Sequence, residues 1–200
     1  MGTEVLLYVP NLIGYLRLAL LCASLWFYSS PVWFLSLYGL SAFLDGFDGY
    51  FARKLNQSSV FGAWFDVVID NISRGFLWCL LYKWGYGVIL VEWLTFVCTH
   101  KRGANWRIPD ENFPLLCKLV MQNCFKSPLG IIALTGVHCL PVWLYACDSN
   151  FLTDLGLHLW LQYTGSAVLV VGRLLAFRVE IFYIMTHIRT MLDETASTSD

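Results

Sequence analysis

Six long apolar stretches dominate this chain, and short polar segments separate them. They cover about residues 11–28, 31–52, 59–82, 85–100, 127–147 and 160–187. A helix that crosses a lipid bilayer needs ~20 consecutive, mostly apolar residues. The stretch at 85–100 is the weakest of the six because it is short and carries Glu92. The pattern predicts an all-α integral membrane protein with six transmembrane helices.

The low charge of the chain supports this fold class. Only 14% of its 200 residues are charged and 58% are hydrophobic, whereas about 25% of the residues of an ordinary soluble domain are charged. The formal net charge is −1, so we expect no nucleic-acid partner. We expect residues 1–192 to form a single six-helix membrane domain and residues 193–200 to form a short, polar, disordered tail.

Basic residues near the ends of the stretches predict the orientation in the membrane. The basic residues that follow the second and fourth stretches are Arg53, Lys54, Lys101, Arg102, Arg107 and Lys118. The connections on the other side contain Lys83 but also Asp148 and Asp154. Cytoplasmic loops of membrane proteins are enriched in lysine and arginine. Both termini and the even-numbered loops are therefore expected in the cytosol.

Four aspartates interrupt the second and third apolar stretches. Asp45 and Asp48 are three residues apart, and Asp66 and Asp70 are four apart, so each pair lies on one face of its helix. An aspartate at the centre of a transmembrane helix costs roughly 2.5–3.5 kcal/mol. If the two helices fold together across the 54–58 connection, all four carboxyl groups converge near the cytosolic boundary.

Four ionised carboxylates in one place repel one another, so either the acids are protonated or they bind a divalent metal ion. A ligand set made only of oxygen atoms suits Mg²⁺, Mn²⁺ or Ca²⁺. Gly49 and Gly62 leave room for a diphosphate beside the acids, and Arg53 can clamp it. The alternative is that the small residues only pack helices and that the acids pair with arginines such as Arg17 and Arg74.

The spacing of these residues carries a resemblance to a known family. The segment Asp45-x2-Asp48-Gly49-x2-Ala52-Arg53-x8-Gly62-x3-Asp66-x3-Asp70 matches every position of the CDP-alcohol phosphatidyltransferase signature. Within that family the chain most resembles the eukaryotic phosphatidylinositol synthases, through VPNLIGYLR at 9–17 and IRTMLD at 188–193. The resemblance implies the CDP-alcohol phosphotransferase fold with six transmembrane helices.

The resemblance also implies roles for individual residues. The four that correspond to ligands of Mg²⁺ or Mn²⁺ are Asp45, Asp48, Asp66 and Asp70, and Asp70 also corresponds to the general base. The contacts to CDP-diacylglycerol are expected from Gly49, Arg53 and Ser59. Weaker candidates are Asn11, Arg17, Gly62 and Lys126. An intramembrane counter-ion is the alternative role for Arg17.

The implied reaction transfers a phosphatidyl group from CDP-diacylglycerol to an alcohol, with Asp70 taking the proton of the attacking hydroxyl. The resemblance favours myo-inositol, and the products are then phosphatidylinositol and CMP. The match thins after Asp70, where Asn71 replaces the arginine usual in the synthases and Arg74 follows one turn later. Arg74 is expected to pair either with Asp70 or with Glu92.

Three alternatives stay open at this point. The first is the same chemistry with another acceptor, such as glycerol phosphate, serine or a diacylglycerol. The second is a catalytically silent paralogue that binds CDP-lipid. The third is a small transporter with acidic relay residues, which leaves the Gly-Ala-Arg spacing unexplained. The expected partners are CDP-diacylglycerol, a small alcohol and membrane lipids, and a homodimer is permitted. The resemblance implies a location in the endoplasmic reticulum, with the active site facing the cytosol.

Overall fold

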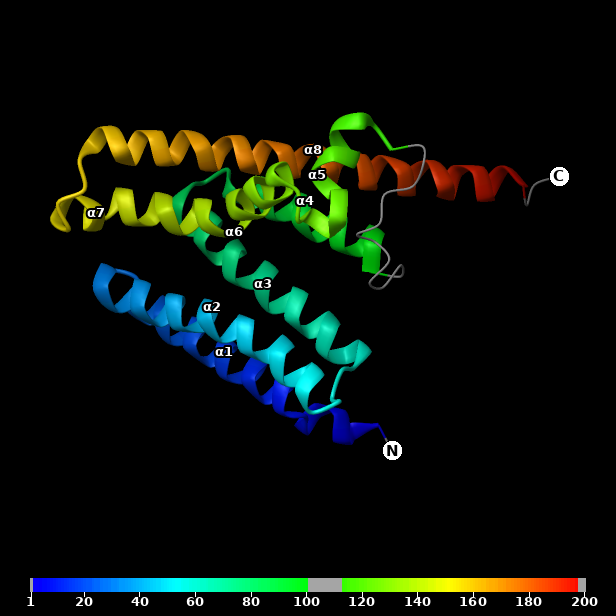
Figure 1. The fold of residues 1–200 in the computed structure, drawn as a ribbon, viewed down its shortest axis with the longest axis horizontal. Helices are drawn as coiled ribbons and strands as arrows, with labels where there is room; N and C mark the ends of the chain where they lie inside the picture. Colours follow the sequence, from blue (N-terminus) through cyan, green and yellow to red (C-terminus); the bar gives the residue numbers. More distant parts are fainter. Residues whose placement is uncertain (1, 101–112, 198–200) are drawn as a thin grey trace. The chain divides into compact units, whose positions relative to one another are not determined.

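The computed structural model describes residues 2–100 and 113–197, and every regular element in that part of the chain is helical (Figure 1). The elements are the 3₁₀ helix η1 (Thr3–Leu7) and the α-helices α1 (Val9–Trp26), α2 (Pro31–Lys54), α3 (Val60–Leu81), α4 (Gly85–Thr99), α5 (Leu115–Phe125), α6 (Pro128–Asp148), α7 (Phe151–Asp154) and α8 (Leu159–Ser197). The prediction of an all-α fold is confirmed.

Six of these helices coincide with the six predicted apolar stretches. Their ends lie within two residues of the predicted ends, except at the end of α8. That helix continues through residues 193–197, so the prediction of a disordered tail is wrong for those residues. The polar side chains there do not stop the helix because Glu194 and Ala196 favour helical backbone and no glycine or proline follows.

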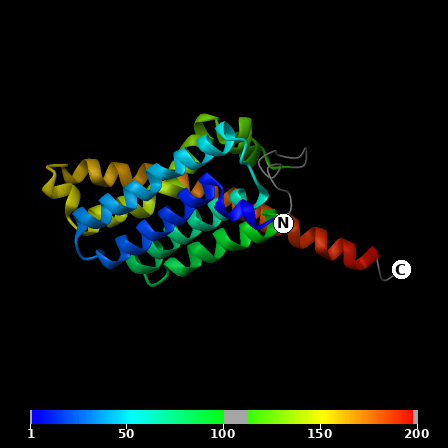
Figure 2. The same ribbon diagram turned by 90° about the horizontal axis from the view of Figure 1, so that it is seen from below.

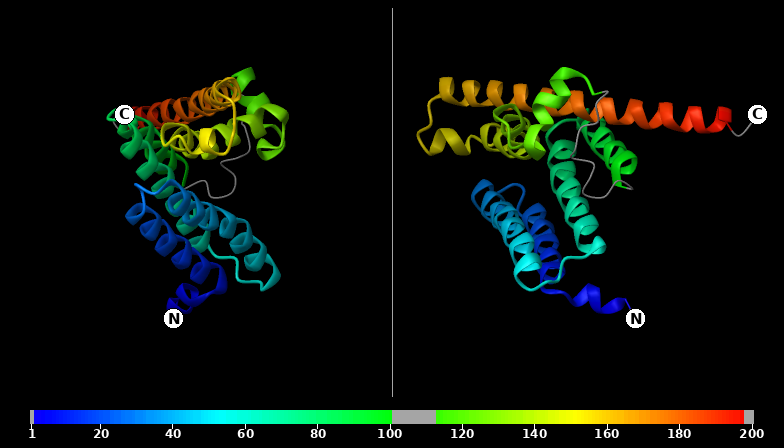
Figure 3. Two further views of the ribbon diagram at one scale, coloured as in Figure 1. Left: turned by 90° about the vertical axis from the view of Figure 1, so that its left-hand side faces the viewer. Right: turned by 45° about the vertical axis from the view of Figure 1, so that its right-hand side comes forward.

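The described chain divides into two compact units. Unit 1 comprises Met1–Leu77 and Tyr145–Gly156, and unit 2 comprises Trp78–Leu144 and Leu157–Asp200. In unit 1, α1 and α2 lie side by side along their length, as the views in Figures 2 and 3 show. The prediction of a single domain over residues 1–192 stays a prediction.

Proline and charge determine where the first helices of unit 1 begin and end. Pro10 lies in the first turn of α1, and Pro31 is the first residue of α2, a position that needs no N–H donor. Arg53 and Lys54 lie in the last turn of α2, where a positive charge interacts favourably with the helix dipole. Asn56 then takes a left-handed backbone conformation with φ of 54°, which turns the chain toward α3.

Aromatic packing holds the opposite end of the α1–α2 pair in unit 1. Phe34 is fully buried, and its ring centroid lies 4.3 Å from that of Tyr145. The Tyr145 hydroxyl donates a hydrogen bond to the backbone carbonyl of Tyr28, at the turn between α1 and α2. This packing fixes the two helices against each other at one end and leaves their other end to carry the polar residues.

Unit 2 is held by a close approach of helix backbones. A Cβ atom at Gly136 of α6 would lie 2.3 Å from the backbone nitrogen of Arg173 in α8, and one at Gly172 would lie 2.2 Å from the carbonyl oxygen of Ile132. Any side chain at these two glycines would push α6 and α8 apart. Small residues at a helix crossing are the usual way for apolar helices to pack inside a membrane.

The helix α5 lies in a segment that the sequence predicts as a loop. It was not predicted because it is only 11 residues long and contains Lys118. Its apolar side contributes Cys117, Val120 and Met121 to the core of unit 2. The chain leaves α5 through Asn123, Cys124 and Phe125, which all have positive φ, and Lys126 follows in unit 2.

Two helices of the described chain, α1 and α6, are long and apolar enough to cross a membrane by length and composition. The other predicted spans are shorter or carry more charged residues. Three of the basic residues that predict the orientation lie outside the described residues: Lys101, Arg102 and Arg107.

Candidate functional site

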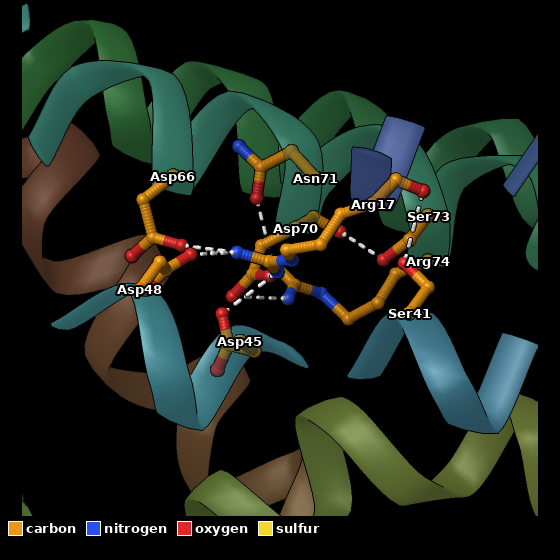
Figure 4. Close-up of polar contacts among 9 residues, drawn as sticks. All are labelled: Arg17, Ser41, Asp45, Asp48, Asp66, Asp70, Asn71, Ser73 and Arg74. Atoms are coloured by element: carbon orange, nitrogen blue, oxygen red, sulfur yellow. Dashed lines mark hydrogen bonds and ion pairs between the residues drawn. The ribbon is translucent and has the colours of Figure 1, made fainter. Parts of the chain in front are cut away.

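The four aspartates come together at one end of unit 1. Asp45 and Asp48 lie in the second half of α2, and Asp66 and Asp70 lie in the first half of α3 (Figure 4). Carboxylate oxygens of Asp45, Asp48 and Asp66 lie within 4.8 Å of one another. The two helices therefore pool their acids as the spacing predicts, while the roles of these residues stay a prediction.

The centre of this acid cluster is the guanidinium group of Arg17, which comes from α1. Its Nη1 lies 2.7 Å from Asp48 Oδ2 and 2.7 Å from Asp66 Oδ1. Its Nη2 lies 2.7 Å from Asp45 Oδ1 and 2.8 Å from Asp70 Oδ1. Arg17 is only 2% exposed. One positive charge thus contacts four carboxylates, and a large excess of negative charge remains.

Asp70 has a second arginine beside it. Arg74 Nη1 lies 3.6 Å from Asp70 Oδ2, and Arg74 Nη2 donates a hydrogen bond of 2.6 Å to Asn71 Oδ1. Of the two partners expected for Arg74, the structure places Asp70 beside it. Arg17 and Arg74 hold the two oxygens of the Asp70 carboxylate, so its orientation is fixed.

Two of the other acids, Asp45 and Asp66, are open on the side away from Arg17. The side chains of Asp45 and Asp66 are 43% and 44% exposed, against 3% for the side chain of Arg17. In Figure 4 the second oxygen of each of these two carboxylates points away from the guanidinium. A ligand can therefore reach the acids from a side that Arg17 does not cover.

A cavity of about 220 Å³ adjoins the acids within unit 1. Asp48 and Asp66 line it, together with five residues predicted as substrate contacts or weaker candidates: Asn11, Gly49, Arg53, Ser59 and Gly62. Among the residues that the structure describes, Arg17 is not part of this lining. The predicted substrate residues therefore gather around one cavity, with the exceptions of Arg17 and of Lys126, which belongs to unit 2.

Ser59 and Gly62 shape the wall of this cavity at the start of α3. The Ser59 hydroxyl accepts a hydrogen bond of 2.9 Å from the Gly62 N–H, so its own O–H can still donate to a ligand. A Cβ atom at Gly62 would lie 2.9 Å from Asn11 Oδ1 and 3.1 Å from Ser59 Oγ. Glycine at this position keeps the wall open.

Sequence reasoning missed the contribution of Gln57. Its Oε1 accepts a hydrogen bond of 2.9 Å from the Val9 N–H, one of the backbone donors that has no partner within α1. Gln57 also lines the cavity. The contact ties the α2–α3 connection to the start of α1, and nothing in the spacing of the sequence indicates it.

The acid cluster fits a divalent metal ion. Its donors are carboxylate oxygens close enough to share one ion, and hard oxygen donors are the ligands that Mg²⁺ and Mn²⁺ prefer. The charge of four aspartates exceeds that of Arg17 and Arg74 together, so a further cation is attracted. The fold and the site define a helical protein with an acid cluster that could hold a metal ion, beside a cavity that has a cationic wall at Arg53.

Comparison with known proteins identifies the family. The family model for CDP-alcohol phosphatidyltransferase matches residues 7–109, just over half of the 200 residues. The chain belongs to the CDP-alcohol phosphatidyltransferase family. No solved structure matches it.

Several curated relatives carry the name CDP-diacylglycerol–inositol 3-phosphatidyltransferase. The one from Candida albicans is 47% identical over 79 residues, which are 37% of this chain and 33% of the relative. The one from Homo sapiens is 45% identical over 79 residues, which are 39% of this chain and 36% of the relative. The one from Saccharomyces cerevisiae is 45% identical over 81 residues, which are 39% of this chain and 36% of the relative. The chain spans about a third of the length of the curated relatives it matches.

Proposed function

We propose that this protein is an integral-membrane enzyme that transfers a phosphatidyl group from CDP-diacylglycerol to myo-inositol and releases CMP. The observation that carries the proposal is the acid cluster of α2 and α3 at the edge of a cavity lined by Arg53 and Ser59. The choice of inositol is supported by the names of the relatives.

The residues of the cavity bind the nucleotide-lipid. Arg53, with its planar guanidinium group, holds phosphate oxygens of the diphosphate, and the Ser59 hydroxyl donates a further hydrogen bond to them. Gly49 and Gly62 leave the space that the diphosphate needs, since neither carries a side chain. Asn11 is only 3% exposed and lies beside Gly62, where its polar side chain can contact the nucleotide.

The acids supply the reactive half of the site. Asp45, Asp48 and Asp66 hold the metal ion, and Asp70 contributes to the same site. When bound, Mg²⁺ or Mn²⁺ neutralises charge that develops on the diphosphate and makes CMP a better leaving group. Asp70 takes the proton of the alcohol hydroxyl as that oxygen attacks the β-phosphorus. Arg17 and Arg74 hold its two oxygens, and the expected pairing of Arg74 with Asp70 weakens Asp70 as a base relative to an unpaired carboxylate.

The membrane arrangement is part of the proposal. We propose that α2, α3, α4 and α8 cross the bilayer as α1 and α6 do, which gives six spans in a single catalytic domain over residues 1–192. Both termini and the site then face the cytosol, where a soluble alcohol and a lipid both have access. The endoplasmic reticulum and a homodimer are proposed on the resemblance alone.

A panel of acceptor alcohols tests the function. Membranes that contain the protein receive CDP-diacylglycerol, Mg²⁺ or Mn²⁺ and one labelled alcohol at a time. Label from myo-inositol is expected to enter a phospholipid, and matched membranes with Asp66→Asn show the background. No transfer to any alcohol, with CDP-diacylglycerol still bound, would identify a catalytically silent paralogue.

A second candidate function is the same transfer to a different alcohol. One observation favours it: the family model ends at residue 109, so α5, α6, α7 and α8 lie outside the matched region. A second observation is that the position after Asp70, where the synthases usually have an arginine, is occupied by Asn71, which accepts a hydrogen bond from Arg74. Incorporation of glycerol phosphate, serine or diacylglycerol without incorporation of inositol would establish this candidate in place of the first.

A further inference from the structure

We propose that Arg17 is a positioning residue of the metal site, which holds the aspartates in their ion-binding arrangement before the ion binds. The inference rests on the proposed function in one respect, that the acids bind a divalent metal ion. No motif position assigns this task to Arg17, and the sequence leaves it as a counter-ion or a weaker candidate for a substrate contact.

The first observation is that each terminal nitrogen of Arg17 joins two helices. Nη1 contacts Asp48 of α2 and Asp66 of α3, and Nη2 contacts Asp45 of α2 and Asp70 of α3. The guanidinium group therefore cross-links α2 to α3 twice, from a third helix. Only arginine offers two donor nitrogens in one rigid plane for such a contact, whereas lysine offers a single nitrogen.

The second observation concerns the side from which Arg17 approaches. The guanidinium group contacts one oxygen of each of the four carboxylates. The second oxygens of Asp45 and Asp66 point away from it (Figure 4). Arg17 is buried, while the side chains of Asp45 and Asp66 are almost half exposed. These two oxygens are therefore accessible to an ion without loss of the contacts that Arg17 makes.

The third observation is that Arg17 is itself held in place. The Ser41 hydroxyl of α2 donates a hydrogen bond of 3.1 Å to the Arg17 carbonyl oxygen, which fixes α1 against α2 at this residue. Four short contacts at the other end of the side chain restrict its rotamers. Groups of this kind, which orient the ligands of a metal ion from behind, typically change metal affinity 10–100-fold when they are replaced.

The two roles open to Arg17 predict opposite effects of its removal. A mere counter-ion competes with the metal for the carboxylates, so its loss strengthens metal binding. A positioning residue keeps mutually repelling carboxylates close together, so its loss weakens metal binding even though a positive charge is removed. The sign of the change in affinity decides between them.

The test is a titration of Mn²⁺ with the purified, substrate-free protein in detergent, in which electron paramagnetic resonance measures the free ion. Arg17→Gln is expected to raise the Kd for Mn²⁺ at least about tenfold, and Arg17→Lys is expected to fall between it and the unchanged protein. Asp66→Asn, which removes a ligand, is the positive control. Arg178→Gln, which removes an exposed arginine from unit 2, is the matched control and is expected to leave the Kd unchanged.

An unchanged or lower Kd in Arg17→Gln overturns the inference, and so does the absence of Mn²⁺ binding to the unchanged protein without substrate. If Arg17→Gln does not fold, the same decision is made with Arg17→Lys, since an unchanged Kd there overturns the inference as well. The outcome is separable from the proposed function. If Arg17→Gln binds Mn²⁺ more weakly but the unchanged protein does not transfer a phosphatidyl group, only the proposed function is contradicted. If the unchanged protein transfers a phosphatidyl group but Arg17→Gln binds Mn²⁺ as tightly as it does, only the role of Arg17 is contradicted.

Discussion

Each compact unit of the described chain contains a cluster of charged side chains built around a buried arginine. In unit 1, Arg17 contacts four aspartates. In unit 2, Arg173 Nη1 lies 2.8 Å from Glu180 Oε2, and its Nη2 lies 3.5 Å from Glu92 Oε1. The side chains of Glu92 and Glu180 are only 4% and 13% exposed. The two clusters use the same chemistry but differ in charge balance and in access.

The difference in charge and access distinguishes the cluster of unit 1, a proposed binding site, from the cluster of unit 2, a structural contact. Charged residues in apolar helices are costly, and they are kept either for function or in pairs. The cluster of unit 2 is closed, has one acid more than it has arginines, and joins α4 to α8. The cluster of unit 1 has more excess negative charge, is open on one side, and adjoins a cavity. Charge excess and access, rather than the presence of charge, indicate where a cation and its ligand bind.

Breaking the cluster of unit 2 is expected to have the largest effect on stability. Arg173→Met leaves Glu92 and Glu180 buried beside an apolar side chain, and removal of one partner from a buried ion pair costs about 3–5 kcal/mol. Denaturant unfolding of the purified protein, followed by circular dichroism, measures this loss. The combined variant Arg173→Met with Glu92→Gln is expected to recover part of it, because the buried charge is removed too. A loss of transfer per folded molecule in these variants would contradict the purely structural assignment.

Breaking the cluster of unit 1 is expected to affect activity more than stability. Asp66→Asn removes a proposed metal ligand, and we expect a fall in kcat/KM of more than about 100-fold, or about 2.7 kcal/mol of transition-state stabilisation. The unfolding free energy of the metal-free protein is expected to change little, since one of four like charges is removed. Transfer of phosphatidyl label measures the first quantity and denaturant unfolding the second. Retained, metal-dependent transfer in this variant would show that Asp66 is not a ligand.

The contrast between the clusters also marks the limit of what the sequence predicts. Six helices can be predicted from the sequence because each has a long apolar run. The convergence of the acids follows from their spacing along α2 and α3. The place of Arg17 depends on how α1 packs, for example through Tyr15 against Phe65, whose ring centroids are 5.1 Å apart. No local pattern encodes that contact. The sequence likewise does not predict the left-handed backbone conformation at Asn123, Cys124 and Phe125, since none of these residues is glycine.

Narrowing the cavity is expected to have a moderate effect. The Cβ atom of Gly62→Ala would press on Asn11 Oδ1 and Ser59 Oγ, so we expect KM for CDP-diacylglycerol to rise about tenfold, or about 1.4 kcal/mol. Gly39→Ala in α2 is the matched control, because nothing lies within 4 Å of a Cβ atom there. Initial rates at several CDP-diacylglycerol concentrations give KM for both. An equal KM in the two variants would exclude this wall of the cavity from substrate binding.

The smallest effect is expected from the contact that ties the α2–α3 connection to α1. Gln57→Ala removes the acceptor of the Val9 N–H, and the loss of one hydrogen bond typically costs about 0.5–1.5 kcal/mol of stability. Gln57→Glu keeps an acceptor oxygen at the same reach and places a negative charge at the start of α1, where the helix dipole favours it. We therefore expect the alanine variant to unfold at a lower denaturant concentration and the glutamate variant to match the unchanged protein. If both variants lose the same stability, the hydrogen bond is not what holds the connection, and packing of the glutamine stem against the cavity wall takes its place as the cause.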